Sequence, residues 1–132
     1  MLTGEQGPRL RQIASAGAPA QRIATAIRWL KHHFAEPLHI EALAREVRLS
    51  PSALHRYFKA VTAMSPLQYQ KRLRLQEARR AMLGDGLDAS GAGFRVGYGS
   101  PSQFSREYNR FFGAPPHRDS EALRLEPQPL RV

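Results

Sequence analysis

The stretch Ser-Pro-Ser-Ala-Leu-His-Arg-Tyr-Phe-Lys, residues 50–59, decides the fold, because it returns in altered form as Ser-Pro-Ser-Gln-Phe-Ser-Arg-Glu-Tyr at residues 100–108. Serine is a favourable N-cap, since its hydroxyl oxygen accepts a hydrogen bond from a first-turn N–H, and proline at the first helical position loses no hydrogen bond. Each copy is therefore predicted to open a helix. The repeat indicates an internal duplication of a helix-turn-helix unit.

Helical periodicity extends outward from both copies. Apolar residues spaced as on one face of a helix, together with capping and breaking residues, predict helices over 20–36, 40–47, 51–61, 66–83, 88–96 and 103–112. No stretch alternates with the period of a strand. We therefore expect an all-α fold of about seven helices, in which two helix-turn-helix subdomains are joined by a long linker helix.

This pattern predicts five segments along the chain. The first and last are a linker or a remnant of a missing N-terminal regulatory domain at 1–19 and a flexible tail at 118–132. Between them we expect a first helix-turn-helix subdomain at 20–63, a linker helix at 64–83 and a second subdomain at 84–117.

The composition restricts the class of protein. The 132 residues contain no Cys and carry a formal net charge of +9, and residues 50–83 alone hold seven basic side chains against one acidic. Such an excess predicts a polyanionic partner, either nucleic acid or an anionic membrane surface. Arginines interrupt every apolar stretch, and charged residues at 5, 9 and 11 argue against a signal peptide, so we expect an intracellular, cytoplasmic protein without a membrane partner.

The helix predicted at 51–61 has two contrasting faces. Leu54, Phe58 and Val61 form the predicted core face. The opposite face carries side chains that can donate hydrogen bonds: Ser52, His55, Arg56 and Lys59. In the second copy the predicted core residues are Phe104, Tyr108 and Phe111, and the outward ones are Gln103, Arg106 and Arg110. Arg can pair with guanine and Gln with adenine in the major groove, although ordinary solvated faces would look similar.

The linker helix is expected to bridge the two copies. Helices that enter successive major grooves lie about 34 Å apart, and a helix over 66–83 would be about 28 Å long. Its basic residues could lie along a DNA backbone or be paired internally, for example with Glu77: Lys71, Arg72, Arg74, Arg79 and Arg80.

Enzymatic functions are not favoured. The sequence has no Walker-type loop, no nucleophile elbow and no His-Glu-x-x-His motif, and its five histidines are scattered. We expect no catalytic residues, no metal site and no cofactor.

Four segments together carry a family resemblance. Ile-Glu-Ala-Leu-Ala at 40–44, the stretch at 50–59, Met-Ser-Pro-Leu-Gln-Tyr at 64–69 and Arg-Leu-Gln-Glu-Ala at 74–78 resemble the DNA-binding domain of AraC/XylS-type transcriptional regulators. Residues 95–108 and Phe-Gly-Ala-Pro-Pro at 112–116 resemble its second motif. The resemblance covers about 20–117, and residues 2–13 look like the end of the N-terminal regulatory domain found in one branch of the family.

The resemblance implies a bacterial, sequence-specific regulator, often an activator that touches RNA polymerase, whose two units read adjacent major grooves of double-stranded DNA. A small-molecule effector is implied only if an N-terminal domain is missing from this chain. Matching positions assign base reading to Ser52, His55, Arg56, Ser102, Gln103 and Arg106. Phosphate contacts are expected from Ser50, Lys59, Ser100 and Arg110. The alternatives are a module that binds nucleic acid without sequence preference, or one that binds an anionic membrane or a protein partner.

Two departures from the family pattern have structural consequences. Arg48 stands in the first turn where the family usually has Gly, which predicts a strained turn. Ala92 and Gly93 stand where a larger aliphatic residue and Ala are usual, so we expect a weakened second unit and a first unit that dominates binding. On this reasoning Gly93→Ala should raise thermal stability, provided the new methyl group fits.

Overall fold

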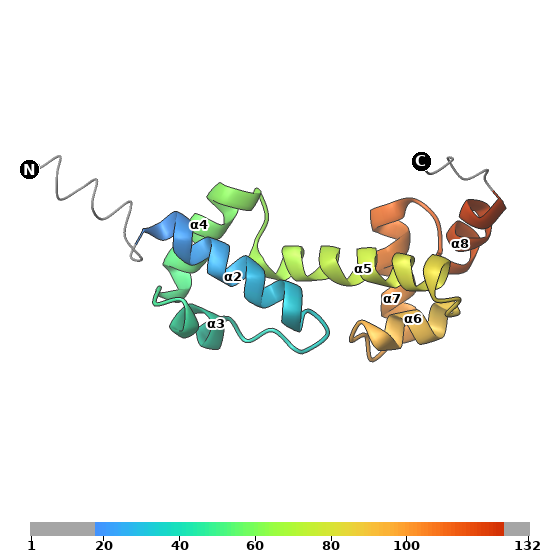
Figure 1. Cartoon of the computed structure of the whole chain (residues 1–132), viewed down its shortest axis with the longest axis horizontal. Coiled ribbons are helices and arrows are strands. Elements are labelled where there is room, and N and C mark those ends of the chain that lie inside the picture. Colours follow the sequence, from blue (N-terminus) through green and yellow to red (C-terminus); the bar gives the residue numbers. More distant parts are fainter. Residues whose placement is uncertain (1–17, 126–132) are drawn as a thin grey trace, which may run out of the picture. The chain divides into compact units, whose positions relative to one another are not determined.

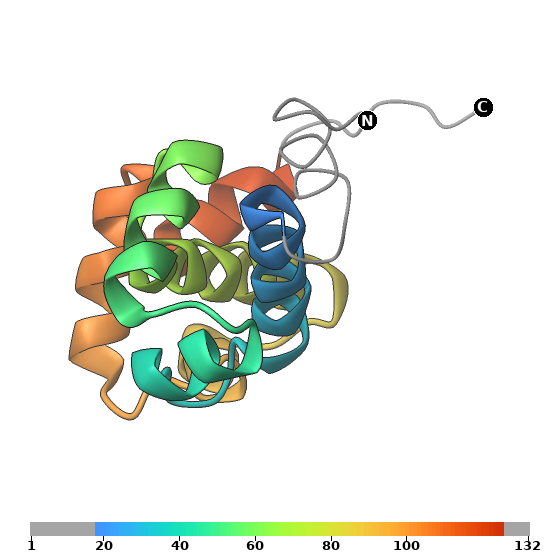
Figure 2. The ribbon, with the colours of Figure 1, turned by 90° about the vertical axis from the view of Figure 1, so that its left-hand side faces the viewer.

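A computed structural model of the chain describes residues 18–125, which form seven helices and no strand (Figure 1). The view turned by 90° likewise shows only helices and loops in this part of the chain (Figure 2). The helices are α2 (Pro19–His33), α3 (Ile40–Glu46), α4 (Pro51–Thr62), α5 (Pro66–Gly84), α6 (Ala89–Arg95), α7 (Pro101–Phe112) and α8 (Pro116–Leu125). The all-α prediction is confirmed. No helix among these residues is long and apolar enough to cross a membrane.

The described residues form two compact units. The first contains residues 18–33 and 38–70, and the second contains residues 34–37 and 71–125. Helix α5 therefore contributes its first turn to one unit and the rest of its length to the other. The subdomain limits expected at 63, 83 and 117 stay predictions.

The first unit packs three helices and the start of α5 around a small apolar core. Helix α4 contacts both α2 and α3. The core residues with almost no exposed surface are Ile23, Ala26, Leu30, Leu43, Ala44, Leu54 and Phe58. This packing holds α4 by its buried face, so its opposite face is free to face solvent.

The second unit repeats this plan with a larger core. Helix α5 supplies Leu75, Ala78 and Met82, and the segment around α6 and α7 supplies Ala92, Val96, Tyr98, Phe104 and Tyr108. The rings of Phe104 and Tyr108 meet edge to face, with their centroids 5.7 Å apart. Aromatic pairs in such arrangements add stability beyond the area they bury.

The duplication runs further than the capping motif. From α4 onward the two copies are offset by 50 residues, and buried positions coincide in pairs: Leu54 with Phe104, Phe58 with Tyr108, Pro66 with Pro116, and Gln70 with Ser120. Both reading-helix candidates also end in a left-handed residue, Ala63 at φ 63° and Gly113 at φ 84°. Helix α8 is thus the second copy of the start of α5.

This register corrects the predicted flexible tail. Residues 116–125 form helix α8, and its buried side packs against the second unit. Asp119 accepts a hydrogen bond from the Tyr108 hydroxyl at 2.5 Å and pairs with Arg79 at 3.1 Å, and Arg124 donates to the Met82 carbonyl. Over residues 118–125 the tail prediction failed because these polar side chains have buried partners that are distant in sequence. The rest of the predicted tail, 126–132, lies outside the described residues. The regulatory-domain resemblance at 2–13 lies outside the described residues.

Two further expectations about the helix faces are wrong. Val61 and Phe111, assigned to the core faces, are 54% and 45% exposed. They occupy equivalent positions in the last turns of α4 and α7, where neither helix has a partner over that side chain. Two large residues of each helix are therefore buried instead of three, and in α7 the partly buried Phe112 also packs against the core.

The departures at Arg48 and Gly93 have different outcomes. Arg48 has φ 61°, so the strained turn is confirmed, and its carbonyl accepts a hydrogen bond from Arg22 at 2.6 Å. Gly93 is buried, and a Cβ built there would lie 2.7 Å from Cδ2 of Phe104. The condition that a methyl group fits at Gly93 is not met, so the reasoning that predicted stabilisation by Gly93→Ala does not apply.

Candidate nucleic-acid interface

The predicted reading face of α4 is exposed and begins at its N-cap. The Ser50 hydroxyl oxygen accepts a hydrogen bond from the Ala53 N–H at 3.1 Å, as the sequence predicted for a cap. Ser52, His55, Arg56 and Lys59 are all exposed. Leu54 and Phe58 on the opposite side are buried, so core packing orients this polar face outward.

Two of these side chains interact with their own helix. Nδ1 of His55 lies 3.1 Å from the Pro51 carbonyl, which can only accept, so Nδ1 carries the proton. With Nδ1 engaged in this way, Nε2 is the ring nitrogen of His55 that remains for an external partner. The Arg56 guanidinium lies 4.8 Å from the centre of the Tyr57 ring, within the range of a cation–π contact.

Helix α7 presents the equivalent face in the second unit. The Ser100 hydroxyl accepts from the Gln103 N–H at 3.2 Å, and Ser102, Gln103, Arg106 and Arg110 are exposed. Within residues 18–125, Arg106 and Arg110 make no hydrogen bond or ion pair. Their charges are therefore available to an external anion.

One acidic residue beside this face was not singled out by the sequence. The carboxylate of Glu107 accepts hydrogen bonds from the Tyr98 hydroxyl at 2.6 Å and from Nε2 of Gln103 at 3.1 Å, and it pairs with Lys71 at 3.3 Å. Burial disfavours the charged carboxylate, but the two hydrogen bonds and the Lys71 charge outweigh it and lower the pKa of Glu107. Burial and the hydrogen bond to Glu107 raise the pKa of Tyr98.

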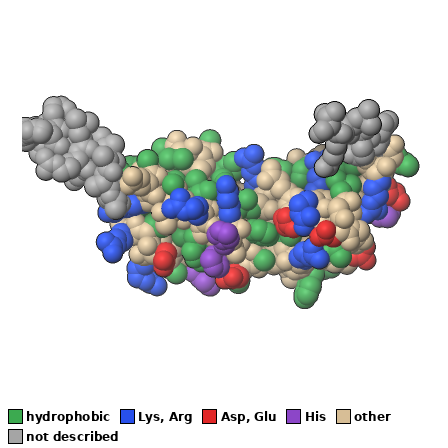
Figure 3. Space-filling view, viewed as in Figure 1, with side chains coloured by type: hydrophobic (Ala, Val, Ile, Leu, Met, Phe, Trp, Pro, Cys, Tyr) green, Lys and Arg blue, Asp and Glu red, His purple; other side chains and the backbone are tan. Residues whose placement is uncertain are grey.

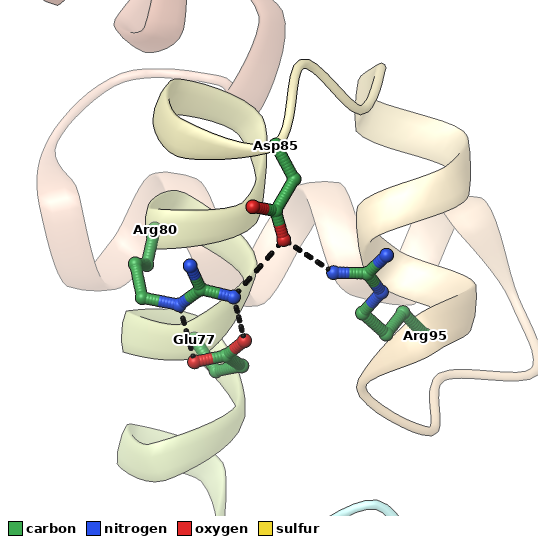
Figure 4. Close-up of polar contacts among 4 residues, drawn as sticks. All are labelled: Glu77, Arg80, Asp85 and Arg95. Atoms are coloured by element: carbon green, nitrogen blue, oxygen red, sulfur yellow. Dashed lines mark hydrogen bonds and ion pairs between the residues drawn. The ribbon is translucent and has the colours of Figure 1, made fainter.

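The basic residues of α5 are mostly engaged within the second unit. Arg80 pairs with Glu77 at 2.6 Å and with Asp85 at 3.1 Å, and Asp85 also accepts from Arg95 at 2.7 Å (Figure 4). Hydrogen bonds from Arg95 and Arg80 lower the pKa of Asp85, and those to Glu77 and Asp85 raise the pKa of Arg80. Acidic and basic side chains accordingly lie side by side over the end of α5 and α6 in Figure 3.

The other cations of α5 show the same behaviour. Arg74 donates to the carbonyls of Phe34 and Glu36, at 2.6 and 3.1 Å, and burial lowers its pKa. Lys71 and Arg79 hold Glu107 and Asp119. Of the five cations considered for a DNA backbone, Arg72 alone makes no hydrogen bond or ion pair within residues 18–125. The internal-pairing alternative is therefore correct for four of them.

The comparisons with known proteins agree with this architecture. Residues 43–121 match a family described as a helix-turn-helix domain. A transcriptional regulator of Chromobacterium violaceum with an AraC-type DNA-binding domain superposes with a TM-score of 0.75 and 28% identity, covering 86% of this chain and all of that one. The chain belongs to the AraC-type helix-turn-helix family.

Two other similar proteins extend the comparison. Within the AraC family, the HTH-type transcriptional activator RhaS of Escherichia coli strain SE11 is 32% identical over 97 residues, which are 74% of this chain and 35% of RhaS. The chain thus spans about a third of the length of this curated relative. The DNA-binding domain of AdpA, solved in complex with a target DNA, has a TM-score of 0.73 and 25% identity, over 78% of this chain and 93% of that one.

No group of three or more His, Cys, Asp or Glu residues in the described part of this AraC-type chain could hold a metal ion. The parts assigned to the ten predicted contact residues stay predictions.

Proposed function

We propose that this chain binds double-stranded DNA with sequence preference and regulates transcription, with α4 and α7 as its two reading helices. The observation that carries the proposal is the repeated exposed face of hydrogen-bond donors behind equivalent Ser-Pro caps. Helices that read base edges use such side chains at their N-terminal ends in the major groove. The AdpA domain bound to its target DNA supports the same partner for this fold.

The proposal assigns different parts to residues along each face. Ser52, His55 and Arg56, with Ser102, Gln103 and Arg106, would read base edges. Ser50, Lys59, Ser100 and Arg110 would contact phosphates. Each helix offers two exposed cations, Arg56 with Lys59 and Arg106 with Arg110, and phosphate neutralisation by such cations makes affinity depend on salt.

The regulatory part of the proposal follows the curated relative. Since RhaS is named a transcriptional activator, we propose that this chain also belongs to an activator that works in the bacterial cytoplasm and contacts RNA polymerase. A small-molecule effector would act only through a sensor domain beyond the residues of this chain.

Selection from a random pool of duplex DNA tests the central proposal. The 132-residue chain should enrich a consensus, and its affinity for that consensus should fall steeply with salt, by a log–log slope of several units. Recovery of no preferred sequence, with tight binding to any duplex, would favour the non-specific alternative. An affinity unchanged between low and moderate salt would contradict an electrostatic DNA contact.

Four variants separate base reading from phosphate contact. Arg56→Ala and Arg106→Ala should each cost about 1–3 kcal/mol on the preferred site and relax preference at one position. Lys59→Ala and Arg110→Ala should weaken binding to all sequences alike and reduce the salt slope by about 1 each. Equal losses on preferred and random DNA in all four variants would show that the two arginines touch phosphates alone.

A further inference from the structure

The carboxylate of Glu107 on α7 bears on which base the second unit prefers. We propose that Glu107 is a positioning residue that fixes the amide of Gln103 and so sets the base preference of α7. The inference rests on the proposed function, because it requires Gln103 to face a base pair.

The chemistry of the contact determines how the amide is turned. Nε2 of Gln103 lies 3.1 Å from Oε2 of Glu107. An ionised carboxylate can only accept, so the amide NH2 must face Glu107 and the amide oxygen must face elsewhere. One N–H is consumed by Glu107, and the second N–H and the carbonyl oxygen remain for a base. That pair of groups is what a bidentate contact with adenine requires.

The carboxylate is itself held from two other directions. The Tyr98 hydroxyl donates to Oε1 of Glu107 at 2.6 Å, and Lys71 lies 3.3 Å from Oε2. Tyr98 is 6% exposed and belongs to the core of the second unit. Because Glu107 is anchored to the core, it can hold a long side chain that would otherwise rotate freely.

The first unit does not contain this arrangement. At an offset of 50 residues, Gln103 corresponds to Ala53 and Glu107 corresponds to Tyr57. Tyr57 lies beneath the guanidinium of Arg56 instead. The outward side chains of the two reading helices are therefore held by different contacts: Gln103 of α7 by a carboxylate, and Arg56 of α4 by an aromatic ring.

Loss of the Glu107 contact should lower the base preference, but it should not lower the overall affinity for DNA. A correctly oriented amide discriminates adenine from other bases by about 5- to 150-fold. If the Gln103 amide is no longer held in the free protein, its side chain must become ordered when DNA binds. This cost should reduce the discrimination between adenine and other bases by about two- to tenfold. Removing the negative charge should at the same time strengthen binding to any duplex.

The test is a double-mutant cycle on the full chain. Selection from random duplex DNA with the unmodified protein and with Gln103→Ala first identifies the base pair whose preference depends on Gln103. Preference at that pair is then measured for Glu107→Gln, alone and combined with Gln103→Ala. We expect Glu107→Gln to reduce the preference for adenine when Gln103 is present and to change nothing when it is absent.

Glu121→Gln is the matched control, because it removes one negative charge from the same unit at an exposed position whose ion pair within residues 18–125 is with His117 alone. It should leave the preference unchanged. An unaltered preference in Glu107→Gln overturns the proposal, and so does a Gln103→Ala variant that alters no position. If Glu107→Gln still lowers the preference when Gln103 is absent, the role of Glu107 is merely structural and the proposal is also overturned. Should Glu107→Gln unfold, Tyr98→Phe offers a second test. Failure of the unmodified chain to enrich any sequence would instead contradict the proposed function.

Discussion

Substitution of Gly93 by alanine tests how the second unit is packed. In a solvent-exposed helix this change is stabilising, because glycine costs about 0.5–1 kcal/mol relative to alanine. Here the added methyl group would lie 2.7 Å from Cδ2 and 2.8 Å from Cγ of Phe104. Phe104 is 2% exposed and lies between the rings of Tyr98 and Tyr108, so it has no room to move aside.

The two contributions have opposite signs and can be compared. Overpacking a core costs about 1–3 kcal/mol, and the gain in helix propensity returns about 0.5–1 kcal/mol. We therefore expect Gly93→Ala to destabilise the second unit by about 1 kcal/mol, the difference between the midpoints of these two ranges. The corresponding fall in Tm is about 4–8 °C per kcal/mol.

Thermal unfolding followed by circular dichroism measures this effect. Gly99→Ala is the matched control, because a Cβ at Gly99 meets nothing within 4 Å, and it should change stability by no more than about 0.5 kcal/mol. A Tm for Gly93→Ala equal to or above that of the unmodified chain would refute the packing argument.

A second substitution should restore part of the loss. Helices α3 and α6 are offset by 49 residues, so Gly93 corresponds to Ala44, and at the offset of 50 Phe104 corresponds to Leu54. Ala44 and Leu54 are both buried. A smaller residue in one helix is thus matched by a larger one in the other. The double variant with Phe104→Leu should be more stable than the sum of the two single effects predicts, by about 0.5–3 kcal/mol.

Three further predictions concern single residues. Arg48→Gly should raise stability by about 0.5–1 kcal/mol, because glycine adopts the left-handed backbone without strain; Arg48→Ala, which keeps the strain, should not. Asp119→Ala leaves the Tyr108 hydroxyl and Arg79 without their partner, so it should cost about 1–3 kcal/mol in urea unfolding, and no loss would mean that α8 is dispensable. Because the pKa of Glu107 is lowered in the folded state, its ionisation stabilises the fold at pH values above the ordinary carboxyl pKa of 4.5, and this contribution is lost as the pH falls through the folded-state pKa. Glu107→Gln should therefore reduce the fall of Tm at acidic pH when Tm is measured against pH.

Sequence reasoning located the helices because their signals are local. A serine cap followed by proline specifies where α4 and α7 begin: α4 starts at the predicted Pro51, and α7 starts at Pro101, two residues before the predicted range of 103–112. Helix α8 has an equally local signal in Pro116, but its apolar content is low and its stabilising contacts are polar. A polar helix cannot be distinguished from a loop until its distant partners, such as Tyr108 for Asp119, are known.

The candidate site was predictable as a face but not as a set of free side chains. Exposure of Ser52, Arg56, Ser102 and Arg106 follows from the helical period once the core side is identified. The engagement of Gln103 with Glu107 does not follow, because it depends on the rotamer of a long side chain and on an anchor at Tyr98. Such contacts are determined by tertiary packing, which cannot be predicted from the spacing of residues along the chain.

Charge counting along the chain does not show which unit holds the counted cations, and the expected dominance of the first unit stays a prediction. The seven-to-one basic excess of residues 50–83 suggested a strongly positive first unit and linker. Four of those seven cations lie in the second unit and are bound to its own carboxylates or carbonyls. Helices α4 and α7 offer two exposed cations each, so the count of cations on the two reading faces gives no reason for unequal binding by the two units. The negative charge of Glu107, which lies on α7 next to the Gln103 amide, is one difference between the two reading helices that would weaken DNA binding by the second unit, in the expected direction.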